Sequence, residues 1–564
     1  MKFENISLRR IIQEDWAKGS LFLFGVLSVT FFSVIFLGDT LTSLQIPGVL
    51  GSGPYGYTDN FTWRGLLDPG GSTWGPLPQT ALVAHQLKQG VVPLWNPYMG
   101  LGQPLAAAID SMALSPLRIL LHLNPSPWMW DFFILFRLFL AGLFTFLFLR
   151  SIHLTNTASC FGSLLFMLSG YLIFSIDMHH MDAEIFLPYM FLCYEKLVNK
   201  TEKTNWIILG VIGVFFVIIG GQPQSAVLIF GIGIFYYFFR VLSYKKNRLF
   251  RPILKFVILY LLVHLLGFAA SSPILIPFIE FYELSFNNHD VRPGHILGLG
   301  YDPYFSDIVS FIIPYFFGAM HSSWLEGFNW HILHRGYFGV AAVIFSLIAV
   351  MVAFKNSYSP KSLTIFFLVS LILMIGKYYG FFWINWIGRL PVAEMINFGK
   401  YMGPLMAFSV AVLASIGLDR ISASEKPFSI FRIGAFCSIS VIILSYFYYL
   451  RYLNGNGGPI NHSYFGKDSL PDMFFNLFGT TGGLYIVTLV VGVGLFFILL
   501  LYVLFKKLEI NNQLDVEKFK LIVLALAFIE LFIYVPNPGF LKNRNERADI
   551  FNKAPYIEFL QKNI

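Results

Sequence analysis

The residues of this chain best suited to chemistry first gather ahead of its second long apolar run. Four aspartates lie there, and a carboxylate can take a proton from an attacking hydroxyl group, so each is a candidate general base. Asp68 begins an Asp-Pro-Gly-Gly sequence whose glycines would let the backbone approach a bound molecule closely. Alternatively, Asp68 only stabilises a turn. The other three aspartates are Asp39, which follows the first apolar run like a cap, Asp59 and Asp110.

A second group of polar residues lies between two later apolar runs. Two histidines and three carboxylates fall within eight residues, at Asp177, His179, His180, Asp182 and Glu184. Imidazole and carboxylate groups could steer a phosphate or hold a divalent metal ion, for which Asp177 and Asp182 are the candidate ligands. The alternative is a solvated polar turn that ends two helices.

Several cations are candidate partners for a phosphate group. Arg335 and Lys400 are the favoured ones, because both lie in segments expected on the outer side of a membrane. The alternative is that each side chain reaches to lipid headgroups. Arg137 lies inside an apolar run, where a charge is costly, so we expect it to face the interior of a helix bundle. The remaining outer candidates are Arg64, Arg118 and Arg292.

The stretch that holds the first aspartates also carries turn and helix signals. Pro93–Tyr98 is a proline-bounded turn in which Trp95 and Asn96 are candidate substrate contacts. A helical stretch, Gln79–Gln89, precedes this turn, and an amphipathic run, Ala106–Leu123, follows it. We therefore expect short interfacial helices in a compact loop, and loops of this length often carry function.

The elements that must position these residues are membrane helices. The chain is 56% hydrophobic and 12% charged, about half the charged share of a soluble domain. This composition excludes a soluble globular protein. The net charge of +8 lies mostly in short loops between apolar runs, so it predicts membrane orientation and no nucleic-acid partner.

The apolar runs predict an all-α polytopic membrane protein, a bundle of about 13 transmembrane helices. Loops rich in Lys and Arg alternate along the chain with loops that have few: residues 240–255 hold six, and residues 177–182 hold none. This pattern places the N-terminus in the cytoplasm and the C-terminus outside. The expected spans are 20–37, 127–149, 156–176, 183–197, 205–220, 224–241, 253–274, 336–354, 362–378, 402–419, 429–449, 481–505 and 519–536.

The expected organisation has three parts. Residues 1–19 form a cytoplasmic amphipathic segment, and residues 20–536 form the transmembrane domain. The domain has two large extracytoplasmic loops, 38–126 and 284–335. Residues 537–564 are polar, and we interpret them as an exported segment. This segment either begins a further, truncated domain or is itself a very short one.

The motifs of the first loop and the following spans resemble YfhO-like bacterial membrane proteins, over most of residues 60–420. The likeness begins with an acidic residue, a proline about ten residues later, and the sequence Pro-Leu-Trp-Asn-Pro-Tyr. In the relatives the acid stands closer to that proline, so both Asp59 and Asp68 remain candidates. The later motifs are Phe166–Tyr171, His179–Pro188, Gly221–Gln224, Asn397–Tyr401 and Gly417–Asp419.

The resemblance implies a glycosyltransferase with a GT-C-like bundle in a bacterial plasma membrane. Such an enzyme takes a sugar from a polyprenyl-phosphate donor and transfers it, with inversion, on the outer face. The acceptor would be a cell-envelope component: a teichoic-acid-like polymer, a lipid or a glycan. The resemblance also implies an extracytoplasmic C-terminal domain. It specifies no cofactor, and both a metal-free site and a site with a divalent cation are compatible with it.

Within this interpretation Asp68 is the first choice for general base, with Asp59 and Asp110 as alternatives. His179, His180, Asp182, Arg335, Lys400, Trp95 and Asn96 would contact the substrates. A transporter or flippase of lipid-linked precursors is the second hypothesis. Transporters usually show internal repeats and broken polar helices at mid-membrane, and the sequence has no clear repeat. A third is a non-catalytic assembly factor, which would tolerate loss of the Asp68 carboxylate.

Overall fold

The computed structural model describes most, but not all, of the chain. Asp59, Asp68 and Arg335 lie outside the described residues, as do the expected spans 429–449 and 481–505, nearly all of the loop 284–335, and residues 1–15. The described residues are 16–42, 75–199, 204–244, 250–285, 311, 336–355, 361–421, 513–534, 542–543 and 555–563.

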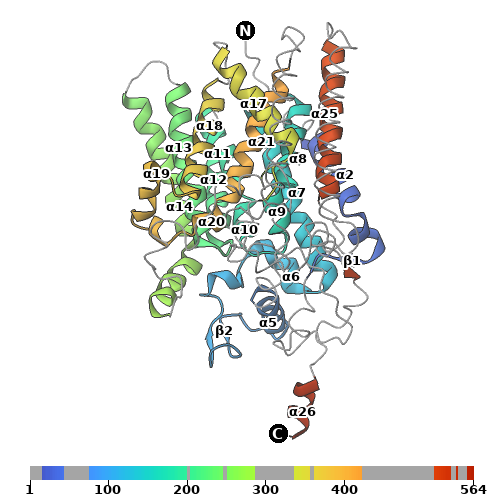
Figure 1. Ribbon diagram of the computed structural model, residues 1–564. Helices are drawn as coiled ribbons and strands as arrows, with labels where there is room; N and C mark the ends of the chain where they lie inside the picture. Colours follow the sequence, from blue (N-terminus) through green and yellow to red (C-terminus); the bar gives the residue numbers. More distant parts are fainter. Residues whose placement is uncertain are drawn as a thin grey trace, which may run out of the picture. The chain divides into compact units, whose positions relative to one another are not determined.

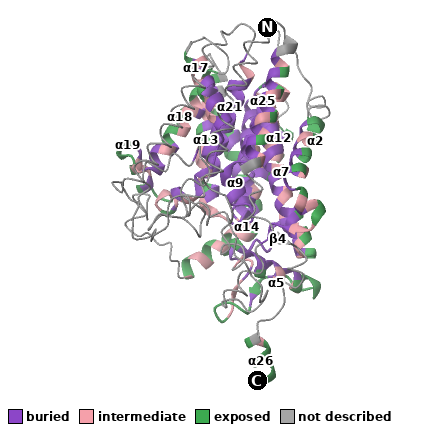
Figure 2. Ribbon diagram, turned by 45° about the vertical axis from the view of Figure 1, so that its right-hand side comes forward, coloured by how far each residue is buried: buried purple, intermediate pink, exposed green. Residues whose placement is uncertain are grey.

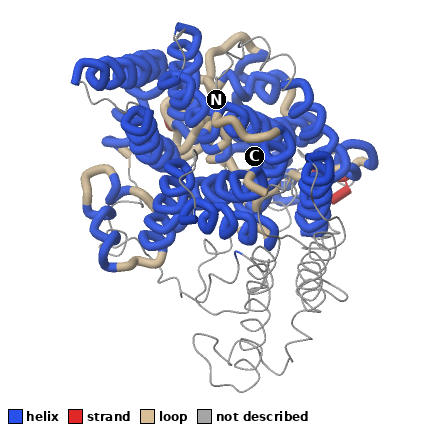
Figure 3. The backbone as a smooth tube through the Cα atoms, turned by 90° about the horizontal axis from the view of Figure 1, so that it is seen from above, coloured by secondary structure: helices blue, strands red, loops and turns tan. Residues whose placement is uncertain are grey.

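Helices make up nearly all the regular structure of the described residues (Figure 3). Six of them are long and apolar enough to cross a membrane: Pro127–Ser151, Asn156–Phe174, Pro223–Ser243, Ile253–Leu284, Lys361–Tyr378 and Phe398–Asp419. Three shorter apolar helices are Trp16–Thr30, Thr204–Ile219 and Val340–Phe354. These helices fit an all-α, multi-pass membrane protein, as the composition predicted. The number of thirteen spans stays a prediction.

The chain divides into two compact units that interleave along the sequence. The first unit holds residues 1–26, 141–174 and 291–535, and the second holds 27–140, 175–290 and 536–564. Helix α2 (Trp16–Thr30) and helix α7 (Pro127–Ser151) each contribute residues to both units. We describe each unit by itself.

Helix α21 (Gly403–Asp419) forms the centre of the first unit and contacts α8, α9, α17, α18 and α20. Its residues are almost all buried (Figure 2). The helix is nearly all apolar, and its serines donate to carbonyl groups one turn back, as Ser409 does to Leu405 at 2.8 Å. The other elements of this unit are α8 (Asn156–Met167), α9 (Gly170–Phe174), α17 (Val340–Lys355), α18 (Lys361–Tyr378), α19 (Phe382–Asn385), η6 (Trp386–Arg389), η7 (Ala393–Met395), α20 (Phe398–Tyr401) and α25 (Gln513–Tyr534).

Glycines set the spacing of these helices. A Cβ atom at Gly417 would lie 1.9 Å from the carbonyl oxygen of Phe345 in α17. A Cβ atom at Gly162 in α8 would lie 1.9 Å from Oγ of Ser415. Small residues at helix crossings allow backbones to approach closely, which is the usual way that membrane helices gain packing energy.

A buried carboxylate caps helix α17. Glu530 on α25 accepts hydrogen bonds from the amides of Val340 at 2.6 Å and Ala341 at 3.3 Å, and from the hydroxyl group of Tyr337. The first amides of a helix have no partner within it, so this acid satisfies groups that would otherwise be unpaired in an apolar setting.

Four helices pack together in the described part of the second unit. Helix α11 (Leu187–Asn199) contacts α12 (Thr204–Ile219) and α13 (Pro223–Tyr244), and α12 contacts α14 (Phe250–Leu284). Helix α14 has 35 residues. At 1.5 Å per residue it is roughly 50 Å long and exceeds a bilayer core of about 30 Å. It therefore extends well past the expected span 253–274. Further elements of this unit include η2 (Ser33–Leu37), β1 (Asp39–Thr40), α10 (Met181–Glu184), β4 (Lys542–Asn543) and α26 (Pro555–Asn563).

The described part of the first loop is compact (Figure 1). Helix α5 (Pro76–Lys88) covers most of the stretch that the sequence predicted to be helical. Strands β2 (Trp95–Asn96) and β3 (Gln103–Pro104) pair antiparallel, with Trp95 opposite Pro104. The amphipathic run that follows forms three short helices: η3 (Ile109–Ser111), η4 (Pro116–Arg118) and α6 (Ile119–Leu123).

An apolar cluster fastens this loop to the start of α7. It contains Leu77 of α5, Leu121 of α6, and Trp130 and Phe133 of α7, all buried. Near the start of α7, Asp131 also accepts hydrogen bonds from the amide of Leu41 at 2.8 Å and the hydroxyl group of Thr40 at 3.0 Å. Both ends of the first loop are therefore held at the same helix.

Candidate functional site

The second unit contains a cluster of buried charges drawn from three elements. Arg118 ends helix η4 in the first loop, Arg137 lies in α7, and Asp182 lies in α10. Arg137 stands ten residues after the first residue of α7, or about 15 Å along the helix axis. This distance places the cluster well inside an apolar helix and not at its end.

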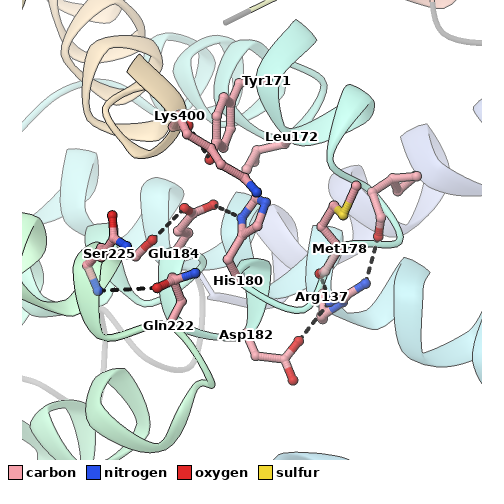
Figure 4. Close-up of polar contacts among 12 residues, drawn as sticks. Arg137, Tyr171, Leu172, Met178, His180, Asp182, Glu184, Gln222, Ser225 and Lys400 are labelled. Atoms are coloured by element: carbon pink, nitrogen blue, oxygen red, sulfur yellow. Dashed lines mark hydrogen bonds and ion pairs between the residues drawn. The ribbon is translucent and has the colours of Figure 1, made fainter. Parts of the chain in front are cut away.

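Asp182 accepts a hydrogen bond from a different arginine at each of its oxygens. Nε of Arg118 lies 2.6 Å from Oδ2, and Nη1 of Arg137 lies 2.7 Å from Oδ1 (Figure 4 draws the second pair). The side chains of both arginines are at most 1% exposed, and that of Asp182 is fully buried. Buried charges persist only when they are paired and hydrogen-bonded, and this arrangement supplies both.

Further groups stabilise the guanidinium of Arg137. It donates to the carbonyl oxygens of Met178 at 2.7 Å and Ile176 at 2.6 Å. Its Cζ atom lies 4.9 Å from the ring centre of Phe133. The buried carboxylate of Asp177 also interacts electrostatically with this guanidinium group. The aromatic face and the carbonyl groups partly replace the water that this cation loses.

A second buried chain of hydrogen bonds begins two residues before Asp182. Nδ1 of His180 lies 2.9 Å from Oε2 of Glu184, and Oγ of Ser225 donates to Oε1 of the same carboxylate at 2.8 Å (Figure 4). All three side chains are buried. The carboxylate fixes the orientation of the imidazole, an arrangement that can hold or pass a proton.

The backbone that carries these residues is broken into short pieces. The expected spans 156–176 and 183–197 contain the helices α8, α9, α10 and α11, with turns between them. Almost every residue of the broken stretch is buried. Irregular backbone at membrane depth is tolerated only where protein buries it or where it lines a cavity, so such breaks often mark functional sites.

The geometry gives no support to a metal ion at Asp177 and Asp182. In the part of the chain that the structure describes, no three His, Cys, Asp or Glu side chains are arranged to hold a metal ion. Asp182 is instead occupied by the two guanidinium groups. His179 is half-buried, and its ring meets that of His180 edge to face, 5.9 Å between centres.

The candidates of the first loop differ in exposure. Trp95 is exposed, whereas Asn96 is buried and its side-chain oxygen accepts the amide of Tyr98 at 2.9 Å. Asn96 thus shapes the turn. Asp110 lies in η3 and is exposed, whereas its neighbours Ile109 and Ser111 are buried.

Lys400 belongs to the first unit and is half-buried in α20. Asn397 caps this helix by accepting the amide of Lys400 at 3.1 Å, and the carbonyl oxygen of Lys400 accepts the hydroxyl group of Tyr171 at 3.3 Å. Its ammonium group lies 5.4 Å from the ring centre of Tyr401. These hydrogen bonds hold the backbone at Lys400.

A pocket lies beside Arg118 within the first loop. It has a volume of about 530 Å³ and is bordered by the end of α5, the segment 91–93, the turn before η4, and α6. His122 lines it and is buried. Burial and the nearby charge of Arg118 lower the pKa of His122 to about 4, although Asp182 acts in the opposite direction. His122 is therefore neutral at physiological pH.

Sequence reasoning found most members of the charge cluster but not their pairing. It expected Arg137 to face the bundle interior, and the structure agrees. It treated Arg118 as an outer cation and Asp182 as a ligand, and it missed Ser225. The position of Arg137 inside an apolar run could have indicated this pairing. A charge is costly in lipid, so Arg137 needs a buried carboxylate from another element.

Comparison with known proteins gives one structural likeness. The sequence matches no protein-family model and no curated protein. Among solved structures, a single-particle cryo-EM structure of the mycobacterial arabinofuranosyltransferase AftD is similar over 78% of this chain, with a TM-score of 0.41 and 14% identity. This chain spans 27% of the length of that one.

Proposed function

We propose that this protein is a membrane glycosyltransferase that uses a lipid-phosphate-linked sugar. The sugar would pass to a cell-envelope acceptor on the extracytoplasmic face of a bacterial plasma membrane. The resemblance of residues 60–420 to YfhO-like proteins supports this reaction class.

The observation that carries the proposal is the pairing of Arg118 with Asp182. This ion pair joins the first loop, which holds the candidate bases, to a broken helix inside the apolar bundle. A lipid-borne phosphate travels in the plane of the membrane, so its sugar must meet the acceptor close to such a junction. The Leu77 cluster packs the described part of this loop against the start of α7.

In the proposed reaction, a carboxylate of the first loop removes the proton from an acceptor hydroxyl group. The oxygen forms a bond to the anomeric carbon while the bond from that carbon to the phosphate oxygen breaks. The lipid phosphate leaves with the electron pair, and the configuration inverts. Asp68 is our first choice for this base, Asp59 is the alternative, and Asp110 is third.

Arg335 and Lys400 are our candidates for stabilising the leaving phosphate, because oriented cations act most strongly where charge develops. His179, His180 and Trp95 are proposed substrate contacts. Asp182 acts through Arg118 and Arg137, since both of its oxygens are occupied by these residues. Asn96 shapes the loop through its bond to the amide of Tyr98.

One observation favours the alternative, a transporter or flippase of lipid-linked precursors. The broken, buried stretch around α9 and α10 carries charges inside the bundle, and transporters often bind their cargo at such breaks. In this case the protein would move a lipid-linked sugar across the bilayer and form no new glycosidic bond.

Sided proteoliposomes separate these functions. The purified full chain is reconstituted, and a polyprenyl-phosphate radiolabelled sugar is supplied in the membrane with a mixture of envelope lipids and polymers as acceptors. A glycosyltransferase forms labelled product and releases polyprenyl phosphate in equal amounts. Movement of the donor between leaflets without any product would overturn our proposal and favour the transporter.

A further inference from the structure

The pocket beside Arg118 has the size and composition of a ligand site. Its volume of about 530 Å³ falls within the usual range for small-molecule pockets. Its walls are almost entirely apolar, with Val91, Val92, Leu114 and Ile119 among them, and none of the described residues that line it is charged. Such a pocket favours an uncharged, mainly hydrocarbon occupant.

Two buried polar side chains, Ser115 and His122, are among the residues that line this apolar space. His122 is 2% exposed, and in the part of the chain that the structure describes its Nε2 atom makes no hydrogen bond. A buried polar atom left unpaired costs free energy, so a ligand that reaches it with a hydrogen bond gains affinity. The apolar walls and these two polar side chains together fit an amphipathic ligand.

Arg118 lies next to a lining residue in sequence but is itself buried. It is 1% exposed, and its Nε pairs with Asp182. A phosphate in the pocket would therefore lose water without meeting a charged group among the described lining residues, which is costly. The pocket thus disfavours an anionic headgroup.

The pocket lies next to surface suited to lipid. Ile119 forms part of its rim and is 49% exposed, and Leu120 and Leu123 on the same short helix are also exposed. Helix α7, which is long enough to span a membrane, begins four residues after Leu123, and its Trp128 is exposed. Tryptophan is enriched where membrane spans meet water. A lipid chain could therefore reach the pocket from the adjacent bilayer.

We propose that this pocket binds an uncharged glycerolipid, with its hydrocarbon chain along the wall formed by Val92 and Ile119 and a hydroxyl or ester oxygen hydrogen-bonded to His122. The site would hold the lipid anchor of the acceptor. This role as an acceptor site rests on the proposed glycosyltransferase function, whereas binding itself does not.

The test uses the purified full chain in phosphatidylcholine nanodiscs that contain a photoreactive diacylglycerol. After illumination, mass spectrometry locates the label. We expect label on peptides that contain residues 87–93 and 113–122. Ile119→Trp, which fills the pocket, should lower this label at least tenfold. Leu120→Trp is the matched control, because Leu120 is similarly exposed on the same helix but does not line the pocket.

A second pair of measurements tests the polar part of the proposal. His122→Phe keeps an apolar ring and removes the nitrogen, and it should lower labelling about fivefold, the effect of one ordinary hydrogen bond. Unlabelled diacylglycerol should compete at least tenfold better than phosphatidic acid with the same chains. Equal label in wild type and Ile119→Trp, or equal competition by the two lipids, would overturn the proposal.

Failure of the pocket proposal is distinguishable from failure of the proposed function. Pocket labelling without sugar transfer from any donor would remove the glycosyltransferase and leave the lipid site. Sugar transfer without pocket labelling would remove the lipid site and leave the glycosyltransferase.

Discussion

At the scale of single residues, Asp182 supplies the negative charge that stabilises the two buried arginines, Arg118 and Arg137, in the folded protein. Asp182→Asn would leave Arg118 and Arg137 without a counter-charge at hydrogen-bond distance, in a setting where both are almost fully buried. Removing one partner of a buried ion pair costs about 3–5 kcal/mol. We expect the free energy of unfolding in detergent, measured by denaturant titration, to fall by that order.

The pair Lys520 and Glu517 provides the comparison. These side chains lie 3.0 Å apart, and that of Lys520 is 5% exposed, whereas that of Glu517 is 46% exposed. Because water reaches the Glu517 carboxylate, Glu517→Gln should lower the free energy of unfolding by less than Asp182→Asn does. Equal losses in Asp182→Asn and Glu517→Gln would contradict the structural role that we assign to Asp182.

His122 should make stability depend on pH in a defined window. Its pKa is about 4 in the folded protein, against an ordinary value of 6.5. Between these values the unfolded chain binds more protons than the folded one, so stability falls as pH drops from about 6.5 to 4. The slope from this group is at most about 1.4 kcal/mol per pH unit.

The measurement compares melting temperatures of wild type and His122→Phe in detergent from pH 7.5 to pH 4.5. Carboxylates contribute equally to both proteins, so the difference isolates the histidine. The stability of the variant should decline less steeply in acid. Parallel curves would show that His122 is not buried as a neutral group.

Residue types that could do chemistry were recognisable in the sequence, but their partners were not. The density of His, Asp and Glu between Asp177 and Glu184 marked the right segment. Spacing along the chain cannot reveal that Arg118, 64 residues earlier, would reach Asp182. Such pairs depend on how helices cross, which composition and periodicity do not encode.

At the scale of elements, glycine contacts at helix crossings are the feature most open to test. Gly417→Ala in α21 would place a Cβ atom against the carbonyl oxygen of Phe345 in α17, where no room exists. Forcing an extra methyl group into a packed contact costs roughly 1–3 kcal/mol. We expect a lower melting temperature and a smaller yield of folded protein.

Gly231→Ala in α13 is the matched control, because no atom lies within 4 Å of the position that its Cβ would take. Alanine favours helix over glycine by about 1 kcal/mol, so this change should be neutral or stabilising. If Gly417→Ala were as stable as Gly231→Ala, α17 and α21 would not pack as closely as the structure has them.

The sequence predicted which segments are helical better than it predicted where those helices break. Apolar runs of sufficient length gave spans such as 127–149 and 362–378, close to α7 and α18. The turn between the spans 156–176 and 183–197 was expected, but the breaks between α8 and α9 and between α10 and α11 were not, because the residues at those two breaks are mostly as apolar as those in a continuous helix. The polar groups between Asp177 and Glu184 stabilise the turn through contacts from other elements.

At the scale of the whole molecule, charge and composition predicted a multi-pass membrane protein, and the described helices agree. The orientation of the termini and the span count remain predictions. The two interleaved units were not predictable, because each is assembled from segments far apart in the sequence. Function follows from sites and not from the bundle, so it requires a direct test.

That test is the rate of sugar transfer from a polyprenyl-phosphate donor by wild type and three variants, Asp68→Asn, Asp59→Asn and Asp110→Asn, in proteoliposomes with matched amounts of folded protein. We predict that Asp68→Asn alone lowers kcat, by roughly 10²–10⁴-fold, as expected when a general base is lost. A comparable loss in Asp59→Asn alone would move the base and preserve the reaction. If all three variants transfer sugar at the wild-type rate, or if the wild type transfers none, a first-loop aspartate does not serve as the base of a glycosyltransferase.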